Sequence, residues 1–259
     1  MQLLKILGLV FLCVVLLSLV ASMMRDTHPG VSAGQGWWTA RRDSSGLAPN
    51  PHKMVNTAIV QVYDAATYGW RGKAAVHPWI IFKRAGDTQY TRYEVTGWGS
   101  GDRIRKNSHG PDDYWFGAKP NLLVDYRGPE AAALIPQIEA AIASYPWKET
   151  YRAWPGPNSN TFMAHIGRNV PALHLNMPAN AIGKDYRALA RPIGLPPSGQ
   201  GVQLSLLGLI GFTAGPVEGV EINLLGIDMG IQFSPFKLRL PFIGSVNSGG
   251  SQNITRQPG

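Results

Sequence analysis

The sequence contains three short runs rich in β-branched and aromatic residues: TAIVQVY at 57–63, VHPWIIF at 76–82 and YTRYEVTGW at 90–98. Residues of these types favour strands, and each run has the length of a strand. Pro78 marks the start or an edge of the second run, and Gly86-Asp87 provides a turn into the third. We therefore predict three consecutive strands in this part of the chain.

Beyond these strands the pattern becomes helical and then extended again. Residues 128–145 place apolar side chains at helical spacing, although Pro136 inside the run predicts a kink or a late start. A second helix is expected over 160–168 and a short helical patch over 184–191. From 201 to 244, apolar residues alternate with polar residues or glycine, which predicts an antiparallel β-meander.

The amino terminus contains an uncharged apolar run from Ile6 to Met24, preceded only by Lys5. These 19 residues would form about 28 Å of helix, close to the ~30 Å hydrocarbon core of a bilayer. We expect a transmembrane anchor, and a cleaved secretory signal is the alternative. Either way the rest of the chain is exported. For the anchor we expect single-pass attachment to the inner (cytoplasmic) membrane, with the bulk of the chain on the periplasmic or extracytoplasmic side.

These patterns divide the chain into five segments. We expect the anchor or signal over 1–24, a linker over 25–55, an α+β core domain over 56–198, the β-meander over 199–246 and a polar tail over 247–259.

Composition limits the chemistry that the chain can perform. The 259 residues carry a formal net charge of +8 and one cysteine, Cys13, inside the apolar run. Thiol catalysis, disulfide scaffolding and cysteine-ligated metal centres are therefore excluded for the rest of the chain. No histidine pair has the spacing of a zinc hydrolase and no nucleotide-binding glycine motif occurs, so we expect neither a metal nor a cofactor.

The charge also bears on the partners. The basic residues are scattered along the chain, which, together with the anchor, argues against nucleic acid. The expected partner is the lipid bilayer, through the N-terminal helix; an anionic envelope polymer or lipid is a candidate second partner, and a basic surface that is only solvated is the alternative.

The segment WPGPNSNTF at 154–162 is the most distinctive motif. Its prolines and glycine give the backbone a rigid approach to the point where a helix should begin. A serine in that position, here Ser159, lies beside free N–H groups, which lower the cost of an anionic nucleophile and can form an oxyanion hole. Ordinary helix capping by Asn158 or Ser159 explains the same residues.

The motif WPGPNSNTF, the later AIGKDY at 181–186 and the glycine-rich β tail resemble an uncharacterised bacterial domain-of-unknown-function family of membrane-anchored proteins. That resemblance covers most of residues 58–244 and implies no activity. More distantly, the order of elements is similar to that of permuted papain-like folds, which include NlpC-like and lecithin–retinol-acyltransferase-like hydrolases. That order is a strand with a histidine, further strands, and a helix that begins with Asn-Ser-Asn-x-Phe. This likeness implies an α+β fold: a permuted papain-like core of antiparallel strands plus helices, a C-terminal antiparallel β section and one N-terminal transmembrane helix.

The papain-like resemblance also implies a catalytic pair of His77 and Ser159, with serine at the position where such enzymes have cysteine. Ser159 would attack an amide or ester carbonyl, His77 would transfer the proton, and Glu94 is a candidate to orient His77. The residues expected to shape the site or provide oxyanion N–H groups are Asn158, Asn160 and Thr161. A serine hydroxyl ionises far less readily than a thiol, which weakens this chemistry.

Two functions follow from the sequence. One is an envelope hydrolase or acyltransferase that uses His77 and Ser159. The other is a non-catalytic binding or structural module in which Ser159 only caps a helix. Such a module would bind through its basic surface and through exposed aromatic residues such as Trp98, Trp115 and Trp154.

Overall fold

The computed structural model describes residues 2–26 and 36–247, which form an α+β fold of three α-helices and two antiparallel sheets. Residues 27–35 of the expected linker and 248–259 of the expected polar tail lie outside the described residues.

The first sheet has the strand order β4-β3-β2-β1-β5, and every neighbouring pair is antiparallel. Its strands are β1 (Ile59–Ala66), β2 (Val76–Lys83), β3 (Thr91–Val95), β4 (Ile104–Lys106) and β5 (Asn121–Arg127). A short 3-10 helix, η1 (Gly69–Lys73), connects β1 to β2. The three strands expected within residues 57–98 are therefore present as β1, β2 and β3.

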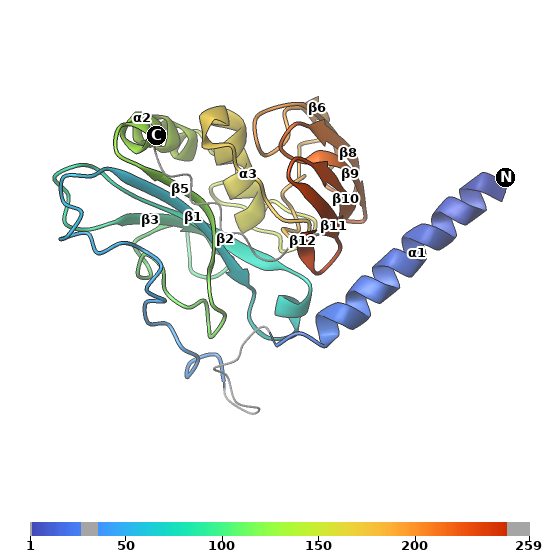
Figure 1. Cartoon of the computed structure of the whole chain (residues 1–259), viewed down its shortest axis with the longest axis horizontal. Helices are drawn as coiled ribbons and strands as arrows, with labels where there is room; N and C mark the ends of the chain where they lie inside the picture. The colour runs from blue at the N-terminus through green and yellow to red at the C-terminus, as the bar shows by residue number, and fades with distance from the viewer. Residues whose placement is uncertain (1, 27–35, 248–259) are drawn as a thin grey trace.

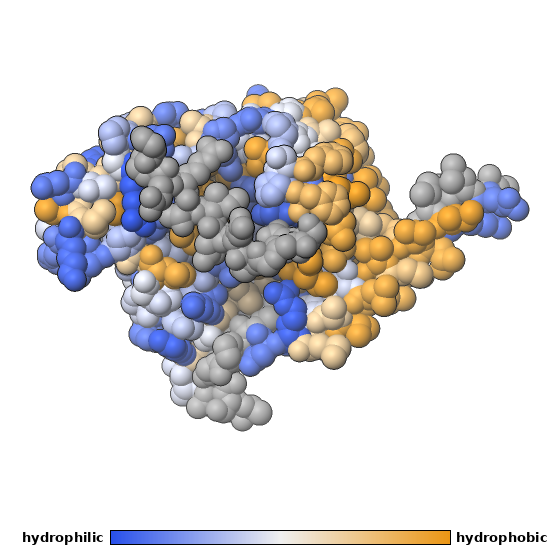
Figure 2. Space-filling model, in the orientation of Figure 1, coloured by the Kyte–Doolittle hydropathy of each residue, from blue (hydrophilic) through white to orange (hydrophobic). Residues whose placement is uncertain are grey.

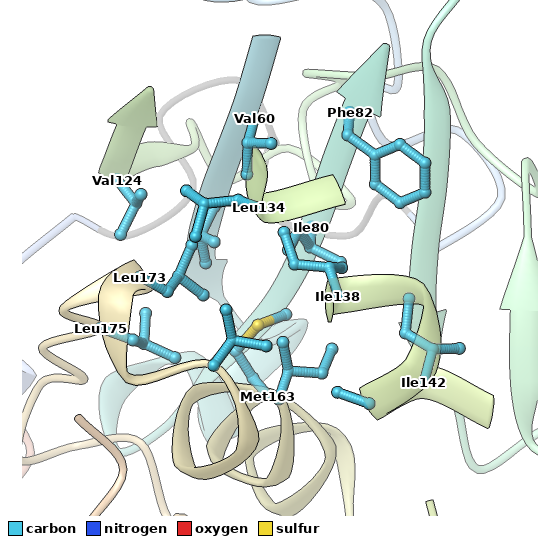
Figure 3. Close-up of a cluster of buried hydrophobic side chains, with 14 of the residues drawn as sticks. Val60, Ile80, Phe82, Val124, Leu134, Ile138, Ile142, Met163, Leu173 and Leu175 are labelled. Atoms are coloured by element: carbon cyan, nitrogen blue, oxygen red, sulfur yellow. The ribbon is translucent and has the colours of Figure 1, made fainter. Parts of the chain in front are cut away.

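Two helices cover one face of this sheet, α2 (Pro129–Ala143) and α3 (Ser159–Asn169) (Figure 1). The main hydrophobic core lies between them and the sheet. Figure 3 shows Val60 and Ile80 of the sheet in this core together with Leu134 and Ile138 of α2 and Met163 of α3. All five side chains are buried, so this layer supplies the principal apolar burial of the fold.

The opposite face of the first sheet carries a smaller aromatic cluster. Successive side chains of a strand point to opposite faces, which places Trp79 and Ile81 of β2 on this side. They pack with Tyr63 of β1 and with Trp115, which comes from the irregular segment between β4 and β5. This cluster forms one wall of the candidate site.

The second sheet is an antiparallel meander with the order β12-β11-β10-β9-β8-β7-β6. Its strands are β6 (Ile193–Gly194), β7 (Val202–Leu206), β8 (Ile210–Gly215), β9 (Gly219–Leu224), β10 (Ile227–Phe233), β11 (Phe236–Leu240) and β12 (Gly244–Asn247). Another 3-10 helix, η2 (Pro171–Leu173), follows α3. The sheet lies beside α3, on the side away from α2 (Figure 1).

The N-terminal helix, α1 (Gln2–Met23), projects away from the rest of the molecule (Figure 1). At its carboxyl end the Ser22 hydroxyl donates to the carbonyl of Lys73, and Nη1 of Arg25 donates to the carbonyl of Ile243 at 2.9 Å. Its described apolar side chains are mostly exposed, with Leu9 at 62% and Leu17 at 71%. In the part of the chain that the structure describes, no helix has the length and apolarity needed to cross a membrane.

The structure differs from the sequence predictions in several details. α2 passes through Pro136 without a break, because Leu134 and Ile138 on either side of it are buried in the core. No helix forms over 184–191, where the side chain of Lys184 is instead buried against the second sheet. β5 was not predicted, because NLLVDYR lacks a clear alternation of apolar and polar residues.

Candidate functional site

His77 lies on the face of β2 that carries the aromatic cluster. Ile80 of the same strand belongs to the main core, whereas Trp79 belongs to the aromatic cluster, and His77 shares the face of Trp79. Its imidazole stacks on the indole of Trp115, with the ring centroids 3.8 Å apart and an interplanar angle of 7°. This stacking fixes the plane of the imidazole ring.

Glu94 on β3 accepts hydrogen bonds from three side chains. Its carboxylate oxygens lie 2.8 Å from Nε2 of His77, 2.9 Å from Nδ1 of His109 and 3.0 Å from Nη2 of Arg92. These four residues are called the Glu94 cluster below. Burial alone would raise the pKa of Glu94, but the hydrogen bonds from His109 and His77 and the charge of Arg92 hold that pKa well below its usual range. Glu94 is therefore ionised.

Arg92 supplies the opposite charge in the cluster. It precedes Glu94 by two positions on β3, so both side chains point to the same face of the sheet. Its guanidinium carbon lies 4.2 Å from the centroid of the Trp79 ring, and Nη1 donates to the carbonyl of Gly110 at 2.7 Å. Because both charges are buried, removing either one would leave the other without compensation.

The hydrogen bonds to Glu94 also determine the tautomers of the His77 and His109 imidazoles. An ionised carboxylate only accepts, so each imidazole presents an N–H to Glu94. Burial lowers the pKa of His77, although Glu94 acts in the opposite direction, so His77 is neutral at pH 7 with its lone pair on Nδ1. In the neutral form of His109 the lone pair lies on Nε2. A carboxylate holding one imidazole nitrogen while the other is free is the arrangement that orients a general base.

A groove of about 520 Å³ lies beside the cluster. Its lining includes Arg92 and His109 from the cluster, as well as Gln89, Tyr90 and Asp112. The side chain of His109 is 18% exposed, compared with 2% for that of Arg92. A molecule bound in the groove would therefore reach the cluster through His109.

The start of α3 is capped by Asn158 rather than by Ser159. Oδ1 of Asn158 accepts from the backbone N–H groups of Asn160 at 2.9 Å and Thr161 at 3.1 Å, and Oγ1 of Thr161 accepts from the backbone N–H of Asn158 at 3.1 Å. This reciprocal pair is a capping box. The two N–H groups expected to hold an oxyanion are thus already bonded to Asn158.

The side chains around the cap hold a distant loop. Nδ2 of Asn160 donates to the carbonyls of Val76 at 3.1 Å and Ile182 at 2.9 Å, and Oγ1 of Thr161 donates to the carbonyl of Gly183 at 2.7 Å. Nδ2 of Asn158 also donates to the carbonyl of Ile182, at 2.9 Å. Asn158, Asn160 and Thr161 therefore have structural contacts that join α3 to β2 and to the loop after η2.

Ser159 is the first residue of α3, and its side chain is hydrogen-bonded to that of Tyr151. α3 packs on the core face of β2, whereas the imidazole of His77 lies on the opposite face. Among the described contacts none joins Ser159 to His77. The structure thus brings His77 together with Glu94, the expected orienting residue, whereas the described hydrogen bond of Ser159 is to Tyr151.

Three residues of the site were missed or misplaced by the sequence analysis. His109 lies in an irregular polar segment, where no local pattern marks a site residue. Arg92 was not considered, although its spacing of two from Glu94 on a strand is a signal for a shared face. Trp115, expected to be exposed, is only 5% exposed because it stacks on His77. Trp98 and Trp154 are exposed, at 52% and 54%.

Within the described residues no group of three or more His, Cys, Asp or Glu side chains is arranged to hold a metal ion. Comparison with curated proteins gives no match, and comparison with solved structures gives none. Residues 57–186 match the profile of the family described as protein of unknown function (DUF3750). This region is half of the chain and contains both the Glu94 cluster and the motif at 154–162. The chain belongs to the DUF3750 family.

Proposed function

We propose that the protein is a non-catalytic binding module of the cell envelope, attached to the cytoplasmic membrane through α1, with the bulk of the chain on the extracytoplasmic side. The observation that carries the proposal is the exposed apolar surface of α1. This helix leaves the body of the molecule with apolar residues on all sides, and Lys5 is its one charged residue. Water is a poor solvent for such a surface, so lipid is the medium that suits it.

The site supports binding rather than catalysis through Ser159. Hydrolysis or acyl transfer on a permuted papain-like core needs the serine and the histidine at one cleft, with free N–H groups for the oxyanion. Here the contacts of His77 lead to Glu94, and the N–H groups of Asn160 and Thr161 are bonded to Asn158. The net charge of +8 favours an anionic envelope polymer or lipid headgroup as the partner, and the groove beside His109 offers a cavity on this side of the sheet.

Membrane attachment can be tested by fractionation of cells that express the full chain. We expect the protein to stay in the membrane pellet after a high-salt wash, which removes proteins held by charge alone. A variant with Leu9→Lys, Leu12→Lys and Leu16→Lys should move to the supernatant, because three charges on α1 oppose its transfer into lipid. The matched control carries alanine at the same three positions and should stay in the pellet. Equal release of the two variants would contradict the proposal.

The absence of catalysis through Ser159 is tested separately with a serine-reactive fluorophosphonate probe on the full chain in detergent. We expect Ser159→Ala to leave labelling unchanged, because the described hydrogen bond of Ser159 is to Tyr151 and not to a histidine. Labelling that disappears in Ser159→Ala and persists in Ser205→Ala would establish the hydrolase alternative instead.

A further inference from the structure

The second sheet has polar side chains on its inner face and apolar side chains on its outer face. On β9, Glu221 and Asn223 are buried, whereas Val220, Ile222 and Leu224 are 38%, 43% and 41% exposed. The other strands of the sheet repeat this order, with buried Gln203, Ser205, Thr213, Asp228, Gln232 and Arg239. An antiparallel sheet with one solvated face normally has the opposite arrangement.

Buried ion pairs hold the sheet in this orientation. Nζ of Lys184 lies 2.9 Å from Oε2 of Glu221 and 3.0 Å from Oδ2 of Asp185. Arg239 pairs with the other carboxylate oxygen of Glu221, and its Nη1 donates to Oδ1 of Asn176 at 2.7 Å. A shift of register by one residue would expose this network and bury the apolar side chains instead. The apolar outer face is therefore specified by the polar contacts on the inner face.

The outer face is continuous across the strands. Val220 of β9 lies opposite Ala214 of β8 and Ile231 of β10, and Ile231 lies opposite Leu238 of β11. Every outward position from β7 through β11 is apolar. Six strands about 4.8 Å apart and about five residues long give a projected area on the order of 500 Å². The largest apolar patch on a typical monomer has about this size and often serves an interaction.

We propose that the outer face of β7–β12 docks on the hydrocarbon of a lipid bilayer, as a second point of membrane attachment beside α1. This inference rests on the proposed function, since α1 is the element that brings the sheet to the lipid. α1 contacts β11, and Figure 2 shows the apolar surface of the sheet next to that of α1. The two surfaces thus form one apolar region, which a single bilayer can cover.

A tryptophan at the border of this face and the lack of charge on the face itself agree with lipid. Trp154 is 54% exposed, and its indole N–H donates to the carbonyl of Leu225, between β9 and β10, at 2.9 Å. Tryptophan favours the boundary between hydrocarbon and headgroups. The outer positions from β7 through β11 have no charge that lipid would have to desolvate, and the net charge of +8 favours an anionic leaflet.

The experiment is spin-label accessibility in vesicles of phosphatidylcholine with phosphatidylglycerol. The full chain with Cys13→Ser receives one cysteine at a time: Ile222→Cys on the outer face, Leu16→Cys on α1 and Ser100→Cys on an exposed loop of the first sheet. We expect labels at 222 and 16 to collide more with oxygen than with a water-soluble nickel complex. The label at 100 should show the reverse. Leu204→Cys, on the same face, replaces Ile222→Cys if that variant does not fold.

The possible results are distinguishable. A label in lipid at 16 but in water at 222 would overturn the docking of the sheet and leave the attachment through α1 intact. Labels in water at both positions would overturn both proposals. A label at 222 shielded from both reagents, with spin–spin broadening that disappears on dilution with unlabelled chain, would assign the face to a second copy of the chain and overturn docking on lipid.

Discussion

Replacing Asp64 by asparagine should stabilise the protein at alkaline pH. Asp64 lies on β1 with 2% of its surface exposed, and its Oδ1 accepts a hydrogen bond from Nδ2 of Asn121 at 2.9 Å. Burial raises the pKa of Asp64 from 3.8 to about 6. Asparagine has the same shape, keeps the acceptor for Asn121 and cannot ionise, so the substitution removes the charge alone.

The magnitude follows from the two pKa values. Because the folded protein binds the Asp64 proton more tightly than the unfolded chain, the stability due to this group is complete below pH 3.8 and is lost as the pH rises through about 6. A difference of about 2 pKa units corresponds to about 3 kcal/mol at pH 8. We therefore expect Asp64→Asn to raise the free energy of unfolding by up to about 3 kcal/mol at pH 8 and by less than about 1 kcal/mol at pH 4.

The assay is urea unfolding of the full chain in detergent, followed by tryptophan fluorescence at both pH values for the wild type and Asp64→Asn. α1 and the detergent contribute equally to the two proteins, so they cancel in the difference. The reasoning is refuted if the variant is less stable at pH 8, or if its gain in stability is the same at pH 8 and pH 4.

Three further substitutions test the other contacts. Lys184→Met leaves buried carboxylates without their cation and should lower the free energy of unfolding by about 3–5 kcal/mol, measured by the same urea titration; a change below about 1 kcal/mol would contradict the buried pairing. Glu94→Gln removes the carboxylate that raises the pKa of His77, so that pKa should fall further below 6.5 in an NMR titration; an unchanged value would show that the two groups are apart in solution. Asn158→Ala removes the α3 cap and should destabilise the protein by about 2 kcal/mol, whereas Asn158→Asp keeps the acceptor and should lose less; equal losses would count against the capping box.

The local elements of the fold were predictable because they depend on periodicity. β1, β2, β3, α2 and α3 follow runs whose spacing or residue type is specific for strand or helix. The face of β2 on which His77 lies was not predictable. Both faces of that strand are buried and carry large apolar side chains, so the alternation of its residues does not distinguish them.

The rest of the site depends on contacts between distant segments. Glu94 meets His109 because the irregular chain after β4 folds back over the aromatic cluster, and no local pattern encodes that return. The alternation of apolar and polar residues in the second sheet was visible in the sequence. Which of its two faces is buried depends on Lys184, which lies 37 residues before its partner Glu221. The sequence of the strands alone, considered without Lys184, favours the usual arrangement, in which the apolar residues face inward.

The side chains at the start of α3 also join parts of the molecule that are far apart in the sequence. Asn160 bonds the carbonyl of Val76, next to His77, and the same side chain bonds the carbonyl of Ile182, two residues before Lys184. The motif at 154–162 therefore links β2 of the first sheet to the loop that carries Lys184, whose ion pair with Glu221 reaches the second sheet.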